Sequence, residues 1–276
     1  MPTGVHDSAL IVNAFRAKYP SVSSDHFATL WITEESEKWA KAYAEKVGPT
    51  EVLVHALRHR FFLEELSRFL DMFPDGVFIN IGAGFTNYPY LIPSRNSCCE
   101  IDTEFNLNFK KKKLAEFNLN GAIPDRMIQF ITVDDLNNLN EITALSLVLK
   151  EWVDGRPSFI LFEGVFFYLK PETISFLYSI LASLQKKGDI VAATSFRPEE
   201  CSKEMFKRLV EYCRRDYRMM DFMPTTVPTI FYAQQSGYLL ASHENYYGLS
   251  MKYGFHDKLD KPEEVLEEDC YILERL

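Results

Sequence analysis

The stretch VFINIGAGFTNYPYLI, residues 77–92, joins a short apolar run directly to the sequence Gly82-Ala83-Gly84. A run that is apolar throughout, and not only at every second position, is typical of a strand covered on both faces. Glycine has no Cβ, so it lets a bound molecule approach the backbone closely where the strand ends. The stretch therefore predicts a strand, a tight turn and a ligand site beside that turn.

Further apolar runs follow this stretch, separated by segments long enough to form helices. Strands that alternate with helices are typical of an α/β fold with a doubly wound, mostly parallel sheet. The segment 236–253, SGYLLASHENYYGLSMKY, indicates an antiparallel strand pair at the sheet edge, and we expect the acidic tail after Lys258 at the surface. The further runs are SCCEI (97–101), MIQFITV (127–133), SFILFEG (158–164) and DIVAATSF (189–196).

The whole chain, residues 1–276, is expected to form a single domain with three parts. Residues 1–75 carry apolar positions at helical spacing, with Thr33 and Thr50 as candidate N-caps, and predict a cap of extra N-terminal helices. Residues 76–196 hold the predicted strands and form the cofactor-binding core. Residues 197–276 supply a long helix over 199–220 and the C-terminal strands on the substrate side.

The composition excludes several classes of protein. The formal net charge is −9, and an acidic surface repels phosphate backbones, so nucleic acid is not an expected partner. No apolar run approaches the roughly 20 residues that span a bilayer, and the first residues lack the basic and apolar regions of a secretory signal. The five cysteines show no metal-ligand spacing. We therefore expect a cytoplasmic protein with reduced thiols, no metal site and no membrane contact.

An acidic residue ends the second predicted strand. Asp102 lies about 20 residues after Gly82, a spacing that suits hydrogen bonds to the hydroxyl groups of a ribose. The alternative is that Asp102 only caps the following helix. The third glycine of a dinucleotide fingerprint would fall at Asn87, and no P-loop lysine follows the glycines, which disfavours NAD. S-adenosylmethionine, which carries a ribose but no phosphate, remains the better candidate.

S-adenosylmethionine also needs an acid for its ammonium group and a base for its carboxylate. Glu163 ends the fourth predicted strand and can accept from the ammonium group. Arg58, which precedes the first strand, can hold the carboxylate through its planar guanidinium. Asp135 lies at the end of the third strand and can accept from the adenine amino group. Tyr168 is expected to face the cavity and to shape the acceptor pocket.

These motifs resemble the leucine carboxyl methyltransferase family, which groups protein phosphatase C-terminal leucine methyltransferases with bacterial polyketide O-methyltransferases. The resemblance covers roughly residues 9–196 in the motif order of the family, and FEGVFFYL is the most specific element. The motifs are ALRHRFF (56–62), INIGAG (79–84), CEID (99–102) with a following lysine at Lys110, DDLNNL (134–139) and FEGVFFYL (162–169).

The resemblance implies a class I, Rossmann-like methyltransferase fold with S-adenosylmethionine as cofactor. It assigns the carboxylate of the cofactor to Arg16 and Arg58, and the ribose to Asp102. The positions that match the remaining contacts are Gly82 and Gly84 in the glycine turn, Asp135 and Leu136 beside the adenine, and Glu163 near the amine.

One segment departs from the family. After the turn the family usually has Gly-Leu-Asp-Thr-Arg, whereas this chain has Gly84-Phe85-Thr86-Asn87-Tyr88. The missing acid and arginine predict weaker local support of the turn and put turnover in doubt. The basic run 110–113 is interpreted as a solvated helix face, and the lone His243 as structural.

The sequence predicts an S-adenosylmethionine-dependent O-methyltransferase that acts on a carboxylate or hydroxyl oxygen of a small, polyketide-like molecule. No residue is assigned as a general base, which favours an acceptor that ionises readily. The alternatives are methylation of a protein C-terminal carboxylate, a catalytically silent protein that binds S-adenosylmethionine, and a disfavoured NAD-dependent oxidoreductase.

Overall fold

The architecture is a seven-stranded sheet in the order β3-β2-β1-β4-β5-β7-β6, seen in a computed structural model that describes residues 5–276. The first five strands are parallel, and β7 runs antiparallel to both β5 and β6. This is the fold of the class I S-adenosylmethionine-dependent methyltransferases, as predicted. The strands are β1 (Val77–Ile81), β2 (Cys98–Asp102), β3 (Ile128–Thr132), β4 (Ser158–Phe162), β5 (Ile190–Phe196), β6 (Tyr238–Glu244) and β7 (Glu268–Arg275).

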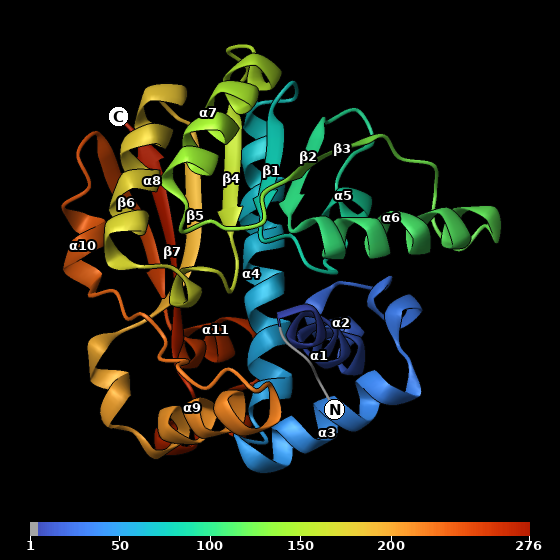
Figure 1. The fold of residues 1–276 in the computed structure, drawn as a ribbon, viewed down its shortest axis with the longest axis vertical. Coiled ribbons are helices and arrows are strands. Elements are labelled where there is room, and N and C mark those ends of the chain that lie inside the picture. The colour runs from blue at the N-terminus through green and yellow to red at the C-terminus, as the bar shows by residue number, and fades with distance from the viewer. Residues whose placement is uncertain (1–4) are drawn as a thin grey trace.

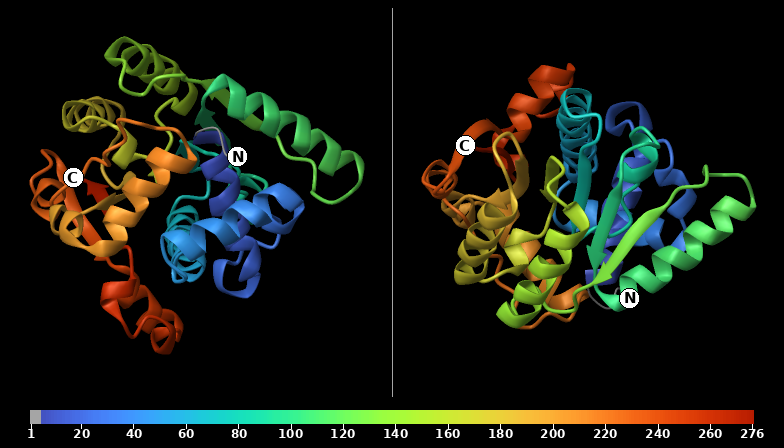
Figure 2. Two further views of the ribbon diagram at one scale, coloured as in Figure 1. Left: turned by 60° about the horizontal axis from the view of Figure 1, so that its bottom comes forward. Right: turned by 90° about the horizontal axis from the view of Figure 1, so that it is seen from above.

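Helices cover both faces of the sheet (Figures 1 and 2). The longer helices are α1 (Val5–Lys18), α3 (Glu34–Lys46), α4 (Glu51–Met72), α6 (Glu104–Leu119), α7 (Leu139–Val153), α8 (Pro171–Leu184), α9 (Glu204–Asp216) and α11 (Tyr246–Tyr253). The short ones are α2 (Pro20–Ser23), α5 (Tyr88–Leu91), α10 (Thr229–Ala233) and the 3₁₀ turns η1 (Ala28–Trp31), η2 (Phe166–Tyr168), η3 (Pro198–Ser202), η4 (His256–Lys258) and η5 (Pro262–Glu264).

Alternating residues of β1 explain why both faces must be covered. Val77, Ile79 and Ile81 pack into the core beneath α7 and α8, whereas Phe78 packs against α4 on the other face. All five residues of β1 are buried, which is the expected result for a central parallel strand. The helices α1, α3 and α9 lie together beyond the carboxyl ends of the parallel strands (Figure 1), and their apolar faces form a separate core.

The C-terminal prediction is wrong in two respects. Only the first part of segment 236–253 is a strand, β6, and the rest forms the helix α11, where Asn245 accepts a hydrogen bond from the backbone N–H of Gly248. The partner of β6 is β7, which lies within the segment predicted as a surface tail. In the structure, β7 is largely buried between β5 and β6.

Three smaller predictions have mixed outcomes. Thr33 is confirmed as an N-cap and forms a capping box with Ser36. Thr50 precedes α4, but its hydroxyl donates to the carbonyl of Glu264, so the predicted side-chain cap is wrong. The helix predicted over 199–220 is shorter, because a 3₁₀ turn precedes α9 and the helix ends at Asp216.

Two further observations concern membrane spans and cysteines. No helix among residues 5–276 is long and apolar enough to cross a membrane. The cysteines are free, and no cluster of three or more potential metal ligands occurs in the described part of the chain.

Candidate functional site

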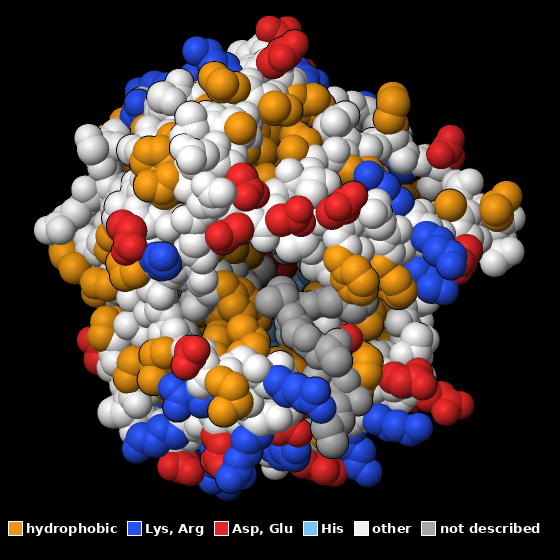
Figure 3. Space-filling model, viewed as in Figure 1, with side chains coloured by type: hydrophobic (Ala, Val, Ile, Leu, Met, Phe, Trp, Pro, Cys, Tyr) orange, Lys and Arg blue, Asp and Glu red, His pale blue; other side chains and the backbone are white. Residues whose placement is uncertain are grey.

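A cavity of about 370 Å³ lies between the carboxyl ends of β1–β4 and the helices α1, α3, α4 and α9. This face of the molecule is hollowed near its centre, and acidic side chains border the hollow (Figure 3). The volume lies in the range of ligand pockets in proteins. All of the residues predicted to form the site line this one cavity: Arg16, Arg58, Gly82, Gly84, Asp102, Asp135, Leu136, Glu163 and Tyr168.

The turn after β1 requires its glycines. Gly82 and Gly84 have φ angles of +69° and +45°, in the left-handed region that other residues rarely adopt. A Cβ on Gly82 would lie 2.4 Å from Cγ2 of Val165, and one on Gly84 would lie 3.2 Å from Cβ of Ala9. The backbone of the turn is therefore brought close to two neighbouring segments and forms a bare edge of the cavity.

Asp102 holds the glycine turn in place. Its Oδ2 accepts from the backbone N–H of Gly84 at 2.7 Å, and its Oδ1 accepts from the backbone N–H of Thr103 and from Nδ2 of Asn106, each at 2.7 Å. A carboxylate can accept about four hydrogen bonds, so Oδ2 keeps the capacity for another donor. Asp102 thus supports the turn and the start of α6, and it still lines the cavity.

Asp135 and Leu136 form the wall after β3. Asp135 is exposed, and its Oδ1 accepts from the backbone N–H of Asn137 at 2.8 Å. Leu136 is half-buried and packs against the main core. An apolar surface beside an exposed carboxylate suits a flat heterocycle that also carries a hydrogen-bond donor.

Arg58 and Glu163 form a buried ion pair at the end of β4. Nε of Arg58 donates to Oε1 of Glu163 at 2.9 Å, and the hydroxyl of Tyr88 donates to Oε2 at 2.7 Å. Burial alone would raise the pKa of the Glu163 carboxyl. The positive charge of Arg58, helped by His59 and Arg16, has the larger effect, so the pKa of Glu163 is lowered overall. Glu163 is therefore an anion at neutral pH.

A second carboxylate reaches the same guanidinium. Nη1 of Arg58 donates to Glu268, which begins β7, and to the hydroxyl of Tyr246. Burial raises the pKa of Glu268, and Arg58 opposes that effect. Nη2 of Arg58 makes no hydrogen bond within residues 5–276 and lies close to Gly164. Arg58 thus keeps one free donor at the cavity.

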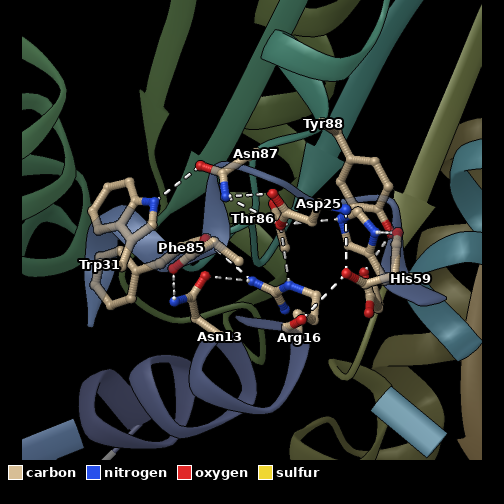
Figure 4. A network of polar contacts seen from close by, with 12 residues as sticks. Asn13, Arg16, Asp25, Trp31, His59, Phe85, Thr86, Asn87 and Tyr88 are labelled. Atoms are coloured by element: carbon tan, nitrogen blue, oxygen red, sulfur yellow. Dashed lines mark hydrogen bonds and ion pairs between the residues drawn. The ribbon is translucent and has the colours of Figure 1, made fainter. Parts of the chain in front are cut away.

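Arg16 belongs to a buried network that ties α1 to the glycine turn (Figure 4). Its Nε lies 3.4 Å from Oδ2 of Asp25, and its Nη2 donates to the carbonyl of Phe85 at 3.1 Å. Nη2 also donates to Oδ1 of Asn13 at 3.2 Å, while Nη1 makes no hydrogen bond within the described part of the chain. Arg16 therefore holds the N-terminal cap against the site and keeps one donor free.

The same network holds the segment Phe85–Tyr88, where this chain departs from the family motif. Nδ2 of Asn87 donates to both carboxylate oxygens of Asp25, and Nε1 of Trp31 donates to Oδ1 of Asn87 at 2.9 Å. Thr86 donates to the carbonyl of Ala83 at 2.9 Å. A residue distant in the sequence, Asp25, therefore supplies a carboxylate that holds the segment after the turn.

Lys110 corrects the interpretation of the basic run 110–113. Its Nζ donates to Oε1 of Glu100 at 2.7 Å and to the carbonyl of Thr86 at 3.0 Å, and the side chain is buried. The first lysine of the run therefore stabilises the turn from α6, and only the remaining ones can belong to a solvated face.

Sequence reasoning missed several titratable residues of the cavity wall, among them Glu51, His55 and Glu268. Glu51 and His55 stand four residues apart on α4, and His55 and Arg58 three apart, so all three share one helix face. Glu268 is the first residue of β7. The helical spacing to Arg58 was a signal that could have identified Glu51 and His55. In contrast, His243 pairs with Asp269 at 2.6 Å and does not line the cavity, in agreement with its structural interpretation.

Three solved structures share the fold of this chain. A candidate methyltransferase from Thermobifida fusca shares the fold with a TM-score of 0.61 and 15% identity, over 88% of this chain and 89% of the other. A DUF574 family protein from Streptomyces avermitilis has a TM-score of 0.62 and 12% identity, over 98% of this chain and 97% of the other. Magnesium protoporphyrin IX methyltransferase from Synechocystis PCC 6803 has a TM-score of 0.50 and 12% identity, over 88% of this chain and 95% of the other. That structure contains bound S-adenosylhomocysteine.

A search of curated proteins gives no match. The model of the leucine carboxyl methyltransferase family matches residues 9–182, which is more than half of the chain and includes the glycine turn, the ends of β2–β4 and Arg58. The chain therefore belongs to the leucine carboxyl methyltransferase family of S-adenosylmethionine-dependent methyltransferases.

Proposed function

We propose that the cavity binds S-adenosylmethionine and that the protein transfers its methyl group to an oxygen atom of a small molecule. The observation that supports this most strongly is the convergence of the glycine turn, Asp102, Glu163 and Arg58 on one cavity at the carboxyl ends of the strands. Ligands of doubly wound sheets bind at this edge.

The charges beside the end of β4 fit the methionyl part of this cofactor. Glu163 and Glu268 place two carboxylates around the single guanidinium of Arg58. Such a surface attracts the ammonium and sulfonium groups, and the free Nη2 of Arg58 can donate to the carboxylate. Arg16 supplies a second free donor, Nη1. Arg16, Arg58, Glu163 and Glu268 hold the amino-acid end of the cofactor. Asp102 binds the ribose, and Asp135 and Leu136 contact the adenine.

A dinucleotide fits the same surface poorly. The only basic side chains of lysine or arginine that line the cavity among residues 5–276 are Arg16 and Arg58, and each already pairs with a buried carboxylate. A pyrophosphate would add two negative charges beside Glu163 and Glu268, and burying unpaired charge is costly. The charge balance thus favours a cationic cofactor over NAD.

The bound cofactor supplies an activated methyl group on its sulfur. The protein must then hold the acceptor oxygen in line with the methyl carbon and the sulfur, and it must exclude water. Positioning alone can lower the barrier to methyl transfer by roughly 7–11 kcal/mol. Tyr168 lines the cavity, with its hydroxyl hydrogen-bonded to Ser8 and its ring 5.8 Å from that of Phe222. We assign Tyr168 to the wall of the acceptor pocket.

Calorimetric titration tests the cofactor. We expect S-adenosylmethionine and S-adenosylhomocysteine to bind, and NAD not to bind. Asp102→Ala should weaken binding of S-adenosylhomocysteine by roughly 1–3 kcal/mol, because a buried hydrogen bond to the ribose is lost. The exposed Asp125→Ala, a matched control outside the cavity, should leave the affinity unchanged. Tight binding of NAD with no response to S-adenosylmethionine would reverse the proposal.

Transfer is tested separately with S-adenosylmethionine that carries a labelled methyl group, incubated with a cell extract. Label in small molecules supports the proposed reaction. Label at protein C-termini would indicate a protein carboxyl methyltransferase instead, and no transfer despite tight binding would indicate a silent binding protein.

A further inference from the structure

The cavity continues past Arg58 along one face of α4, away from the strand ends. Glu51 and His55 follow on this face toward the N-terminus of the helix, and Glu51 stands seven residues before Arg58. With a rise of 1.5 Å per residue, the Glu51 end lies about 10 Å along the helix from Arg58. We call the part of the cavity walled by Glu51, His55 and Tyr43 the distal half.

Two polar atoms of the distal half have no partner. Oε2 of Glu51 accepts from the hydroxyl of Tyr43 and lies 3.5 Å from Nε2 of His55. Oε1 of Glu51 and Nδ1 of His55 are buried and make no hydrogen bond within residues 5–276. Glu51 is 2% exposed and His55 is 8% exposed. Buried polar groups without partners are rare and destabilising, so their presence beside a cavity points to a ligand that supplies the missing bonds.

The charges of the distal half favour an uncharged acceptor over an anionic one. Both arginines of the cavity are paired with carboxylates near the strand ends. When Glu51 is ionised, a carboxylate beside it would meet a second anion, and the arginines that line the cavity among residues 5–276 already have carboxylate partners. Burial of such an anion is costly. An uncharged hydroxyl has no such penalty, because it can donate a hydrogen bond to a carboxylate and accept one as well.

The remaining walls of the distal half are aromatic. The ring of Phe15 stacks on His55 with centroids 5.4 Å apart. Further rings of the cavity wall come from α3, the end of β5 and the segments that follow β4 and α9. Aromatic walls favour a flat, apolar ligand. Rings that line the cavity include Phe15, Tyr43, Tyr168, Phe196, Tyr217 and Phe222.

We propose that the distal half binds an uncharged aromatic molecule through a hydroxyl group, that Glu51 is the base that takes the hydroxyl proton, and that His55 positions Glu51. This inference rests on the proposed function. As the O–H bond breaks, its proton moves to the Glu51 carboxylate. The acceptor oxygen forms the new bond to the methyl carbon while the carbon–sulfur bond breaks and its electron pair stays on sulfur. Glu51 then releases the proton to solvent.

The protonation states suit these roles. Burial raises the pKa of Glu51 to about 8, with help from Glu268 and Glu267, while Arg58 and the Tyr43 hydroxyl oppose the rise. A base with a pKa near the working pH is the most effective one. Burial, with Arg58 and Arg16, lowers the pKa of His55, which keeps its ring neutral. The other titratable groups on this part of the cavity wall are Cys213, Tyr217 and Tyr168.

The first experiment compares two probes that share a ring system, 2-naphthol and 2-naphthoate. Each is titrated into wild-type protein saturated with S-adenosylhomocysteine, and the shift in melting temperature is measured. We expect 2-naphthol to stabilise the complex and 2-naphthoate to have a smaller effect. An equal or larger effect of 2-naphthoate, or no effect of either compound, overturns the inference. Failure to bind S-adenosylhomocysteine, detected before any probe is added, overturns the proposed function itself.

The second experiment measures transfer of labelled methyl to 2-naphthol between pH 6 and 10. Since Glu51 must be ionised, the wild-type rate should rise with pH through about 8. Glu51→Gln should lower the rate at pH 9 by roughly 10²-fold or more and abolish this rise, with unchanged affinity for S-adenosylhomocysteine. Glu45→Gln, on an exposed part of α3, is the matched control and should behave like the wild type.

His55→Asn separates positioning from a structural role. It should shift the midpoint of the pH profile, because the group that orients the Glu51 carboxylate is altered. An unchanged midpoint removes His55 from the proposal. A Glu51→Gln variant that folds, binds S-adenosylhomocysteine and keeps the wild-type rate and pH profile removes Glu51.

Discussion

Asp25→Ala should destabilise the protein more than any surface substitution, because Asp25 is the centre of the network that joins the N-terminal cap to the glycine turn. Its side chain is fully buried, pairs with Arg16, accepts from Asn87, and lies 3.6 Å from Nε2 of His59. Removal of the carboxylate leaves the buried guanidinium without its counter-ion, and such losses cost about 3–5 kcal/mol.

Two further variants calibrate this effect. Asp25→Asn keeps hydrogen-bonding atoms of the same size but removes the charge, so its cost should lie between zero and that of the alanine variant. Asp216→Ala breaks a pair with Lys46 that is 52% exposed on the lysine side, and it should cost less than about 1 kcal/mol.

Urea denaturation at pH 7, followed by circular dichroism, gives the free energy of unfolding of each variant. We also expect Asp25→Ala to bind S-adenosylhomocysteine more weakly, because Arg16 and Asn87 lose the group that orients them. A destabilisation below about 1 kcal/mol, equal to that of Asp216→Ala, would refute the idea that Asp25 joins the N-terminal helices to the glycine turn.

Three other predictions concern single positions. Gly82→Ala should abolish binding of S-adenosylhomocysteine in calorimetry, because the new Cβ would lie 2.4 Å from Val165 on a backbone with φ of +69°; retained affinity would contradict the close packing of the turn. Tyr88→Phe removes the hydrogen bond to Glu163 and should lower the free energy of unfolding by about 1–3 kcal/mol, as measured in urea. Glu51 has a folded-state pKa raised to about 8, so its contribution to stability is present below pH 4–5 and lost as pH rises through about 8. Glu51→Gln should therefore gain stability over the wild type at pH 9, by at most about 5 kcal/mol. Unfolding curves that keep the same difference at pH 5 and pH 9 would contradict this.

The parallel part of the sheet was predictable because its strands are mostly apolar on both faces. β7 was not, because Glu268 and Asp269 make its start look like surface. In the structure, Arg58 pairs with Glu268, and Arg197 and His243 pair with Asp269. These partners are distant in the sequence, so local charge gives no indication that the strand is buried.

The residues of the site also include some that the sequence could predict and some that it could not. The residues at strand ends were predictable, since the carboxyl ends of parallel strands meet at one edge of the sheet. The support of the turn by Asp25 was not, because it depends on how the N-terminal cap packs. The distal half was missed for a similar reason. Glu51 and His55 share a helix face with Arg58, but only the packing of α4 against α1, and of α1 against α3, shows that this face borders a cavity.

The place of β7 in the sheet also affects how the protein can misfold. β6 reaches the sheet only through β7, so the two strands must be added together, and β5 stays an open edge until then. The seven residues of β5 are all buried in the finished sheet and include a largely apolar run. An open, apolar edge strand pairs readily with other chains. Variants that loosen β7 should therefore accumulate as intermolecular aggregates before they lose their helical structure.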